Sequence, residues 1–170
     1  MKYDILIVGS GPGGYVAAIR AAQLGRRVAL VERAEAGGVC LNWGCIPTKA
    51  LLKSAQVYGY CRNAGHYGLE LTGEVRPDPE KIVARSRGVA ETMSKGVQFL
   101  LRKNNIDLIP GFGRLTAPGR LDVEGTTYEA DHIILATGAR PRELPFLPAD
   151  GEHVVTSREA LTLGRLPESL

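Results

Sequence analysis

The sequence is poor in the residues that build metal sites. Its 170 residues include three cysteines and three histidines. No C-x-x-C pair occurs, and the first histidine, His66, comes after all three cysteines. Structural zinc sites are typically built from closely spaced cysteine and histidine pairs. We therefore predict that the chain holds no metal.

The sequence also lacks a charge bias and a long hydrophobic run. It has 21 Lys/Arg against 18 Asp/Glu, a net charge of +3 with no run of like charge, so we do not expect nucleic-acid binding. The uncharged stretch Ile5–Ile19 is 15 residues long, shorter than the roughly 20 that span a bilayer, and glycines interrupt it. We expect neither a membrane span nor a signal peptide. The prediction is a cytoplasmic protein, in which cysteines usually serve redox or metal chemistry.

Apolar runs alternating with helical patterns predict an α/β fold. The run Tyr3–Val8, the helical pattern Pro12–Leu24 and the run Arg27–Glu32 form a strand–helix–strand unit with parallel strands. The remaining pattern predicts helices over 45–64 and 80–104, strands over 106–110, 113–115, 120–123, 127–129 and 132–136, loops over 34–44 and 68–79, and an extended segment over 139–150. One side of the second long helix is expected to carry Ile82, Val83, Val89, Met93, Val97, Leu100 and Leu101.

Glycine is abundant, at 21 of 170 residues, and clusters between the first predicted strand and helix. The cluster reads Gly9-Ser10-Gly11-Pro12-Gly13-Gly14, a G-x-G-x-x-G pattern. Gly9 would permit the tight turn, Gly11 the close approach of a pyrophosphate, and Gly14 the packing of helix on strand. Glu32, 18 residues past Gly14, can accept hydrogen bonds from a ribose and would repel a 2′-phosphate. These residues predict a site for NAD or FAD.

Two cysteines, Cys40 and Cys45, lie in the segment GGVCLNWGCIPTK, residues 37–49. Cys45 stands where a helix is predicted to begin, and a helix N-terminus stabilises a thiolate. Residues i and i+5 of one regular helix point about 140° apart. We therefore expect Cys40 in the loop before the helix, with Gly44 allowing the chain to bring it back. The pattern favours a redox disulfide that serves a flavin, and hence FAD over NAD.

Taken together, these motifs resemble the flavin disulfide reductases. The resemblance rests on the glycine loop, Glu32, the cysteine segment and ILATGARP at 134–141. Residues 41–43 and 14–25 are most similar to the dihydrolipoyl dehydrogenases of that family, and the glutathione and mercuric reductases remain alternatives. The resemblance implies a Rossmann-like FAD-binding domain over residues 1–145, with a parallel sheet, helices and a small β-meander. It also implies an exit segment over 146–170 that leads toward an NAD-binding domain, which we do not find in the sequence.

The resemblance also implies roles for single residues. Cys40 corresponds to the thiol that exchanges with substrate, and Cys45 to the thiol next to the flavin ring. Lys49 corresponds to a lysine whose charge stabilises the reduced ring. The cofactor-binding set it implies is Gly9, Ser10, Gly11, Pro12, Gly13, Gly14, Glu32, Arg33, Gly38, Val39, Cys40, Lys49, Gly113, Ala136, Thr137 and Gly138. We expect no catalytic role for the histidines or Cys61, and we expect Trp43 to serve packing.

The implied activity is oxidation of dihydrolipoamide with NAD⁺, through the cysteine pair and FAD. The implied partners are the lipoyl domain of a 2-oxo-acid dehydrogenase complex and, in the full-length family, a second subunit of a homodimer. The family's histidine base and NAD site are not found in the sequence, so we expect these 170 residues alone to lack turnover. The alternative is an FAD-binding module without activity.

Overall fold

The computed structural model describes residues 2–169. These divide into two compact units. We call residues 2–42 with 91–140 the sheet unit, and residues 43–90 with 141–169 the helix unit. Each is described on its own below.

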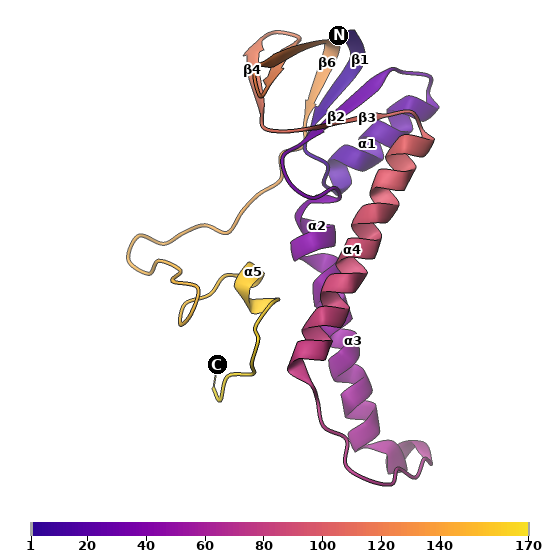
Figure 1. Ribbon diagram of the computed structural model, residues 1–170, viewed down its shortest axis with the longest axis vertical. Helices are drawn as coiled ribbons and strands as arrows, with labels where there is room; N and C mark the ends of the chain where they lie inside the picture. Colours follow the sequence, from indigo (N-terminus) through magenta and orange to yellow (C-terminus); the bar gives the residue numbers. More distant parts are fainter. Residues whose placement is uncertain (1, 170) are drawn as a thin grey trace. The chain divides into compact units, whose positions relative to one another are not determined.

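The sheet unit is built on six strands in the order β3-β2-β1-β6-β5-β4. The strands are β1 (Lys2–Val8), β2 (Val28–Glu32), β3 (Asp107–Pro110), β4 (Gly113–Ala117), β5 (Arg120–Val123) and β6 (Thr126–Leu135). The first four in the spatial order pair in parallel, whereas β5 pairs antiparallel with both β4 and β6. The expected α/β fold, with a parallel sheet and a small meander, is therefore confirmed (Figure 1).

The core of this unit lies along β1 and β2. Leu6, Ile7 and Leu30 are completely buried, and each buried side chain of this size contributes roughly 1.5–3 kcal/mol. Strands that are covered on both faces lose the polar alternation of half-exposed strands, which explains the unbroken apolar run of β2. Helix α1 (Pro12–Gln23) buries its small residues Gly14, Ala18 and Ala21.

The helix unit contains α3 (Cys45–Arg62), the short 3₁₀ helix η1 (Ala64–Tyr67), the first half of α4 (Pro79–Lys103) and α5 (Ser157–Ala160). Within it, α3 and the start of α4 run side by side (Figure 1). Two α4 side chains join them: the buried Ser86 hydroxyl donates to the Pro47 carbonyl over 2.9 Å, and Arg85 donates to the Ala50 carbonyl over 2.9 Å.

Four expectations from the sequence were wrong in part. Residues 34–44 are not all loop, because Gly38–Trp43 form helix α2. The strands expected at 127–129 and 132–136 are one strand, β6. The helix α5 was not expected. The buried positions of α4 are Ser86, Ala90, Ser94, Val97 and Leu101, because small side chains allow close packing, while Met93 and Leu100 are exposed.

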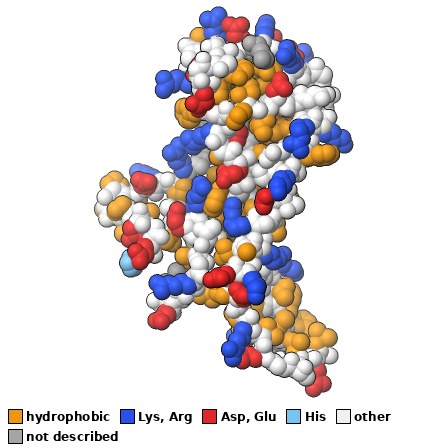
Figure 2. All heavy atoms as spheres, in the orientation of Figure 1, with side chains coloured by type: hydrophobic (Ala, Val, Ile, Leu, Met, Phe, Trp, Pro, Cys, Tyr) orange, Lys and Arg blue, Asp and Glu red, His pale blue; other side chains and the backbone are white. Residues whose placement is uncertain are grey.

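The surface agrees with the balanced composition. On the face drawn in Figure 2, Lys and Arg side chains alternate with Asp and Glu, and no large patch of one sign stands out. None of the helices in residues 2–169 has the length and apolar character that crossing a bilayer requires.

Candidate functional site

Three loops meet at the carboxyl ends of β1, β2 and β6 in the sheet unit. We call residues 9–14, 32–38 and 136–138 the cradle. Gly9 N–H donates to the Val31 carbonyl over 2.8 Å, and Ala136 N–H donates to the Val8 carbonyl over 2.8 Å. The carboxyl edge of a parallel sheet, where neighbouring connections diverge, is the usual ligand site of this architecture.

The cradle is packed so closely that Gly9 and Gly14 leave no room for a side chain. A Cβ on Gly9 would lie 2.3 Å from the Ala136 carbonyl oxygen, and one on Gly14 would lie 1.8 Å from the Gly9 carbonyl oxygen. Gly9 also has φ +100°, a conformation that costs other residues energy. The roles predicted for these two glycines, a tight turn and close helix packing, are therefore those that the backbone requires.

Gly11 differs from both. It is the N-cap of α1, with φ −62°, and no side chain caps that helix end. A Cβ on Gly11 would meet no atom within 4 Å, so the fold itself does not require glycine there. The positive end of the α1 dipole, with open space at Gly11, fits an anion that approaches the backbone.

Glu32 and Ser10 tie the loops of the cradle together. One oxygen of the Glu32 carboxylate accepts from the Ser10 N–H over 2.8 Å and from the Ser10 hydroxyl over 2.6 Å, and the other accepts from the Ala34 N–H over 3.0 Å. The Ser10 oxygen in turn accepts from the Gly37 N–H over 3.2 Å. The sequence predicted Ser10 to lie in the glycine loop but did not indicate that it hydrogen-bonds to both Glu32 and Gly37.

The same hydrogen bonds set the charge of the site. Burial acts to raise the pKa of Glu32, but the bonds donated by the Ser10 hydroxyl and by the N–H groups of Ser10, Ala34 and Arg33 outweigh it and lower the pKa. The carboxylate is therefore ionised at neutral pH. An ionised carboxylate at the end of β2 can accept hydrogen bonds from ribose hydroxyls and repels a further phosphate.

The other cofactor residues predicted from the sequence lie on several elements. Gly38 and Val39 begin α2, and a Cβ on Gly38 would lie 2.6 Å from the Gly11 Cα. The Arg33 guanidinium lies 5.8 Å from the centre of the Phe112 ring. Gly113 begins β4 and packs near Val8. Thr137 and Gly138 follow β6 and are exposed, and Lys49 is an exposed residue of α3 in the helix unit.

Cys40 and Cys45 are both disulfide-bonded, and Cys61, the third cysteine of the sequence, is free. The predicted pairing of Cys40 with Cys45 is therefore confirmed. Its expected context was wrong, because Cys40 lies in α2 rather than in a loop. The two cysteines lie on two helices, with Gly44 at φ −150°, ψ −111° between them, which removes the difficulty that a five-residue spacing poses within one helix.

A side-chain amide holds the start of α2. The Asn42 amide, which is buried, donates to the carbonyl oxygens of Ala36 and Gly38, each over 3.0 Å. Leu41 is also buried. An anchored amide and a buried leucine stabilise a helix that, at six residues, is too short to persist through propensity alone.

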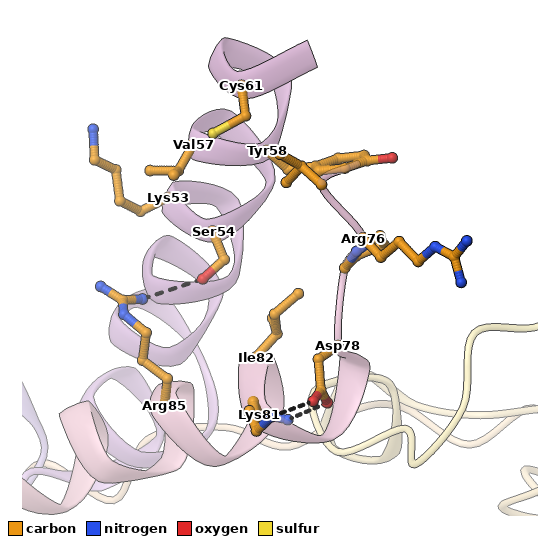
Figure 3. A pocket seen from close by; sticks show the side chains of 12 residues that line it. Lys53, Ser54, Val57, Tyr58, Cys61, Arg76, Asp78, Lys81, Ile82 and Arg85 are labelled. Atoms are coloured by element: carbon orange, nitrogen blue, oxygen red, sulfur yellow. Dashed lines mark hydrogen bonds and ion pairs between the residues drawn. The ribbon is translucent and has the colours of Figure 1, made fainter. Parts of the chain in front are cut away.

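The helix unit contains a cavity of about 390 Å³ between α3 and the segment that enters α4 (Figure 3). Lys53, Arg76, Lys81 and Arg85 line it together with apolar side chains. Arg85 contacts Ser54 over 3.4 Å and Lys81 pairs with Asp78 over 2.9 Å. Ser54 and Asp78, the partners of these two cations, are themselves lining residues of the cavity. We assign the cavity no function. Within residues 2–169 no group of His, Cys, Asp and Glu could hold a metal ion.

The cradle and the disulfide agree with the comparison to known families. Residues 3–170 match the family described as pyridine nucleotide-disulphide oxidoreductase. The chain belongs to that family.

Two similar relatives carry the same name. The chain is 50% identical to a dihydrolipoyl dehydrogenase of Rhizobium etli and 51% identical to one of Zymomonas mobilis, in each case over 99% of this chain and 39% or 37% of the relative. Among solved structures, a crystal structure of LpdA from Mycobacterium tuberculosis matches with a TM-score of 0.86 and 30% identity, over 98% of this chain and 38% of that one. The chain thus spans about two fifths of the length of the relatives it matches.

Proposed function

We propose that these residues form the FAD-binding and disulfide-bearing part of a dihydrolipoyl dehydrogenase. The single observation that carries the proposal is the coexistence, in one chain, of a dinucleotide cradle and a Cys40–Cys45 disulfide. The names of the similar relatives support the subfamily.

The cradle fits FAD through backbone that is left open at Gly11 and through a carboxylate that the cradle keeps ionised. The open backbone at Gly11 and the first turn of α1 would hold the pyrophosphate, and Glu32 would hold the ribose. Arg33, Gly38, Val39, Gly113 and the segment 136–138 would surround the remaining parts of the cofactor. FAD, when bound, would supply the two-electron carrier that no side chain provides.

The disulfide would exchange with the substrate dithiol. A thiolate of dihydrolipoamide attacks the Cys40 sulfur, the Cys40–Cys45 bond breaks, and Cys45 leaves as a thiolate. The second substrate thiolate then attacks the substrate sulfur of the mixed disulfide, which closes the lipoamide disulfide and releases Cys40 as a thiolate. Dihydrolipoamide has lost two electrons and become lipoamide, and the cysteine pair has gained those electrons. The cation of Lys49 would stabilise negative charge that develops nearby.

The proposed whole reaction uses two dinucleotides, FAD and NAD⁺, whereas the sequence contains one G-x-G-x-x-G pattern. We propose that the 170 residues by themselves bind FAD and exchange disulfides but do not reduce NAD⁺. We propose that the complete enzyme is a cytoplasmic homodimer that acts on the lipoyl domains of a 2-oxo-acid dehydrogenase complex. Sustained NAD⁺ reduction by dihydrolipoamide with the 170 residues alone would refute the proposal that these residues do not reduce NAD⁺.

The binding part of the proposal is tested by two glycines, one in the cradle and one outside it. Gly11→Ala and Gly96→Ala each add one methyl group where the protein leaves room, since a Cβ at either position would meet no atom within 4 Å. We expect both variants to fold, and we expect Gly11→Ala to weaken FAD binding at least tenfold, or about 1.4 kcal/mol. Fluorescence titration with FAD measures this. Equal affinity for the two variants would contradict the assignment of Gly11.

A further inference from the structure

Trp43, the one tryptophan of the sequence, lies between two arginines. The guanidinium carbon of Arg87 is 3.9 Å from the centre of its ring, and that of Arg158 is 3.8 Å away. Both distances are well inside the range of a cation–π contact, and tryptophan is the strongest partner for one. Two planar guanidinium groups this near to one ring centre would collide on a single face, so they stack on opposite faces.

Each arginine is held by its own element. Arg87 follows Ser86, whose buried hydroxyl donates to the Pro47 carbonyl, so this turn of α4 is fixed against α3. Arg158 belongs to α5, which begins with a capping box. The Thr156 hydroxyl accepts from the Arg158 N–H over 3.3 Å, and Glu159 accepts from the Thr156 N–H over 2.8 Å. The capping box thereby stabilises the start of the four-residue helix α5, which presents Arg158 to the indole.

Trp43 lies within residues 40–49, which carry both cysteines and which we call the redox segment. It is the last residue of α2, three residues after Cys40 and therefore on the same side of that helix. Only Gly44 separates it from Cys45 in α3. Fixing the indole therefore fixes the turn between the two helices that carry the disulfide. It also places two permanent positive charges against an indole that is one residue removed from Cys45 along the chain.

We propose that Arg87 and Arg158 are positioning residues for the Cys40–Cys45 pair, acting through Trp43, and that their charges favour its reduced form. Cations next to a cysteine favour its thiolate, and a stabilised reduced form makes a disulfide easier to reduce. The segment that contains α5 is then a part of the redox site, although it lies more than 110 residues further along the chain. This inference rests on the proposed function, in which the pair is reduced and reoxidised.

The test uses the full chain, without flavin, in a buffer of reduced and oxidised dithiothreitol. The dithiol gives two electrons and two protons to the protein disulfide and becomes a cyclic disulfide. Alkylation and mass spectrometry then count the free cysteines. We expect Arg158→Gln to shift the equilibrium threefold to tenfold toward the disulfide, which is about 14 to 30 mV at 29.6 mV per tenfold change. Arg158 is exposed, so this substitution should leave the fold intact.

Two variants identify the cause. Arg158→Lys keeps a cation that can lie over the indole face and should restore the equilibrium to within about twofold of the original. Arg165→Gln removes the same charge from an exposed position of the same unit and should change nothing. An Arg158→Gln variant that behaves like Arg165→Gln would overturn the proposal, as would failure of Arg158→Lys to restore the equilibrium.

A double-mutant cycle tests whether Arg158 acts through the indole. If it does, Arg158→Gln should have little further effect in a Trp43→Leu background, whereas independent action would give additive shifts and would overturn the role of Trp43. Because no flavin is present, these results are separable from the proposed function. If the original chain failed to bind FAD, the proposed FAD-dependent function would be refuted. The thiol–disulfide equilibrium of the Cys40–Cys45 pair with dithiothreitol would be unaffected by that result.

Discussion

The cradle and the redox segment are stabilised in different ways. The cradle is held by contacts between backbone atoms. A Cβ on Gly9 would collide with the backbone of Ala136, and a Cβ on Gly14 would collide with the backbone of Gly9. The redox segment is held by side chains from distant parts of the sequence, among them Ser86 on the Pro47 carbonyl and Arg158 on the Trp43 ring. A site packed through backbone atoms is strongly destabilised by one methyl group at a position that has no room for it, whereas a site supported by side chains loses stability in smaller steps.

The largest effect is expected at Gly14. Gly14→Ala places a methyl group 1.8 Å from the Gly9 carbonyl oxygen, and backbone atoms on both sides must move. Overpacking of this kind costs about 3 kcal/mol, a large part of the stability of a domain of this size. Urea unfolding followed by circular dichroism measures the loss.

The neighbouring Gly13→Ala is the matched control for Gly14→Ala. It adds the same methyl group inside α1 where the nearest atom is 4.0 Å away, and alanine is the better helix former by about 1 kcal/mol. We expect it to be neutral or stabilising. If the two variants lost stability equally, the tight backbone packing described for the cradle would be wrong.

These glycine positions were predictable because their cause is local. A strand, a glycine pattern and a helix within a short stretch allow one backbone path, and the acidic residue at the end of the next strand follows from that path. The order β3-β2-β1-β6 follows from the same logic of parallel strands. The cysteine pairing was also predictable, since few cysteines leave few choices.

An intermediate effect is expected at the junction of the cradle loops. Ser10→Ala removes a hydroxyl that donates to Glu32 and accepts from Gly37. The loss should be about 1–2 kcal/mol at pH 7. Ser157→Ala, at an exposed position of α5, serves as the control and should cost less than about 0.5 kcal/mol.

The pH dependence of Ser10→Ala sharpens this prediction. The pKa of Glu32 is lowered in the fold, so its contribution to stability is present above its ordinary pKa of 4.5 and is lost as the pH falls through the lower folded value. Ser10→Ala should remove part of that dependence. The deficit relative to the original chain should therefore shrink between pH 7 and the acid limit of folding, and a deficit that grows on acidification would contradict this account.

The smallest effect is expected at Ser86, in the side-chain-supported region. Ser86→Ala removes one buried hydrogen bond to the Pro47 carbonyl, at a cost of about 1 kcal/mol. Because this contact lies in the helix unit, FAD affinity should stay within about twofold of the original. Chemical unfolding and FAD titration of the same sample check both statements. A tenfold loss of FAD affinity would show that the two regions do not behave separately.

The contacts of the redox segment could not be predicted because their causes are not local. Ser86 lies 39 residues from Pro47 along the chain, and no sequence pattern announces that its hydroxyl is buried. We expected Met93 and Leu100 on one apolar side of α4, yet both are exposed, and the buried positions of this helix include Ser86, Ala90 and Ser94. A search for regularly spaced apolar residues misses small polar residues such as serine, which allow a helix to pack closely against its neighbours. Helix α2 escaped prediction because its stability depends on the Asn42 amide and its carbonyl partners.

The central claim is that the cradle and the Cys40–Cys45 pair together serve one bound flavin. It is tested most directly by loading the chain with FAD, adding two electron equivalents of a dithiol, and recording the absorption spectrum. A Cys45 thiolate next to the flavin should produce a long-wavelength charge-transfer band. Cys40→Ser should show that band without reduction, and Cys45→Ser should bind FAD and show no band. A flavin-loaded, reduced chain that has no such band would contradict the account.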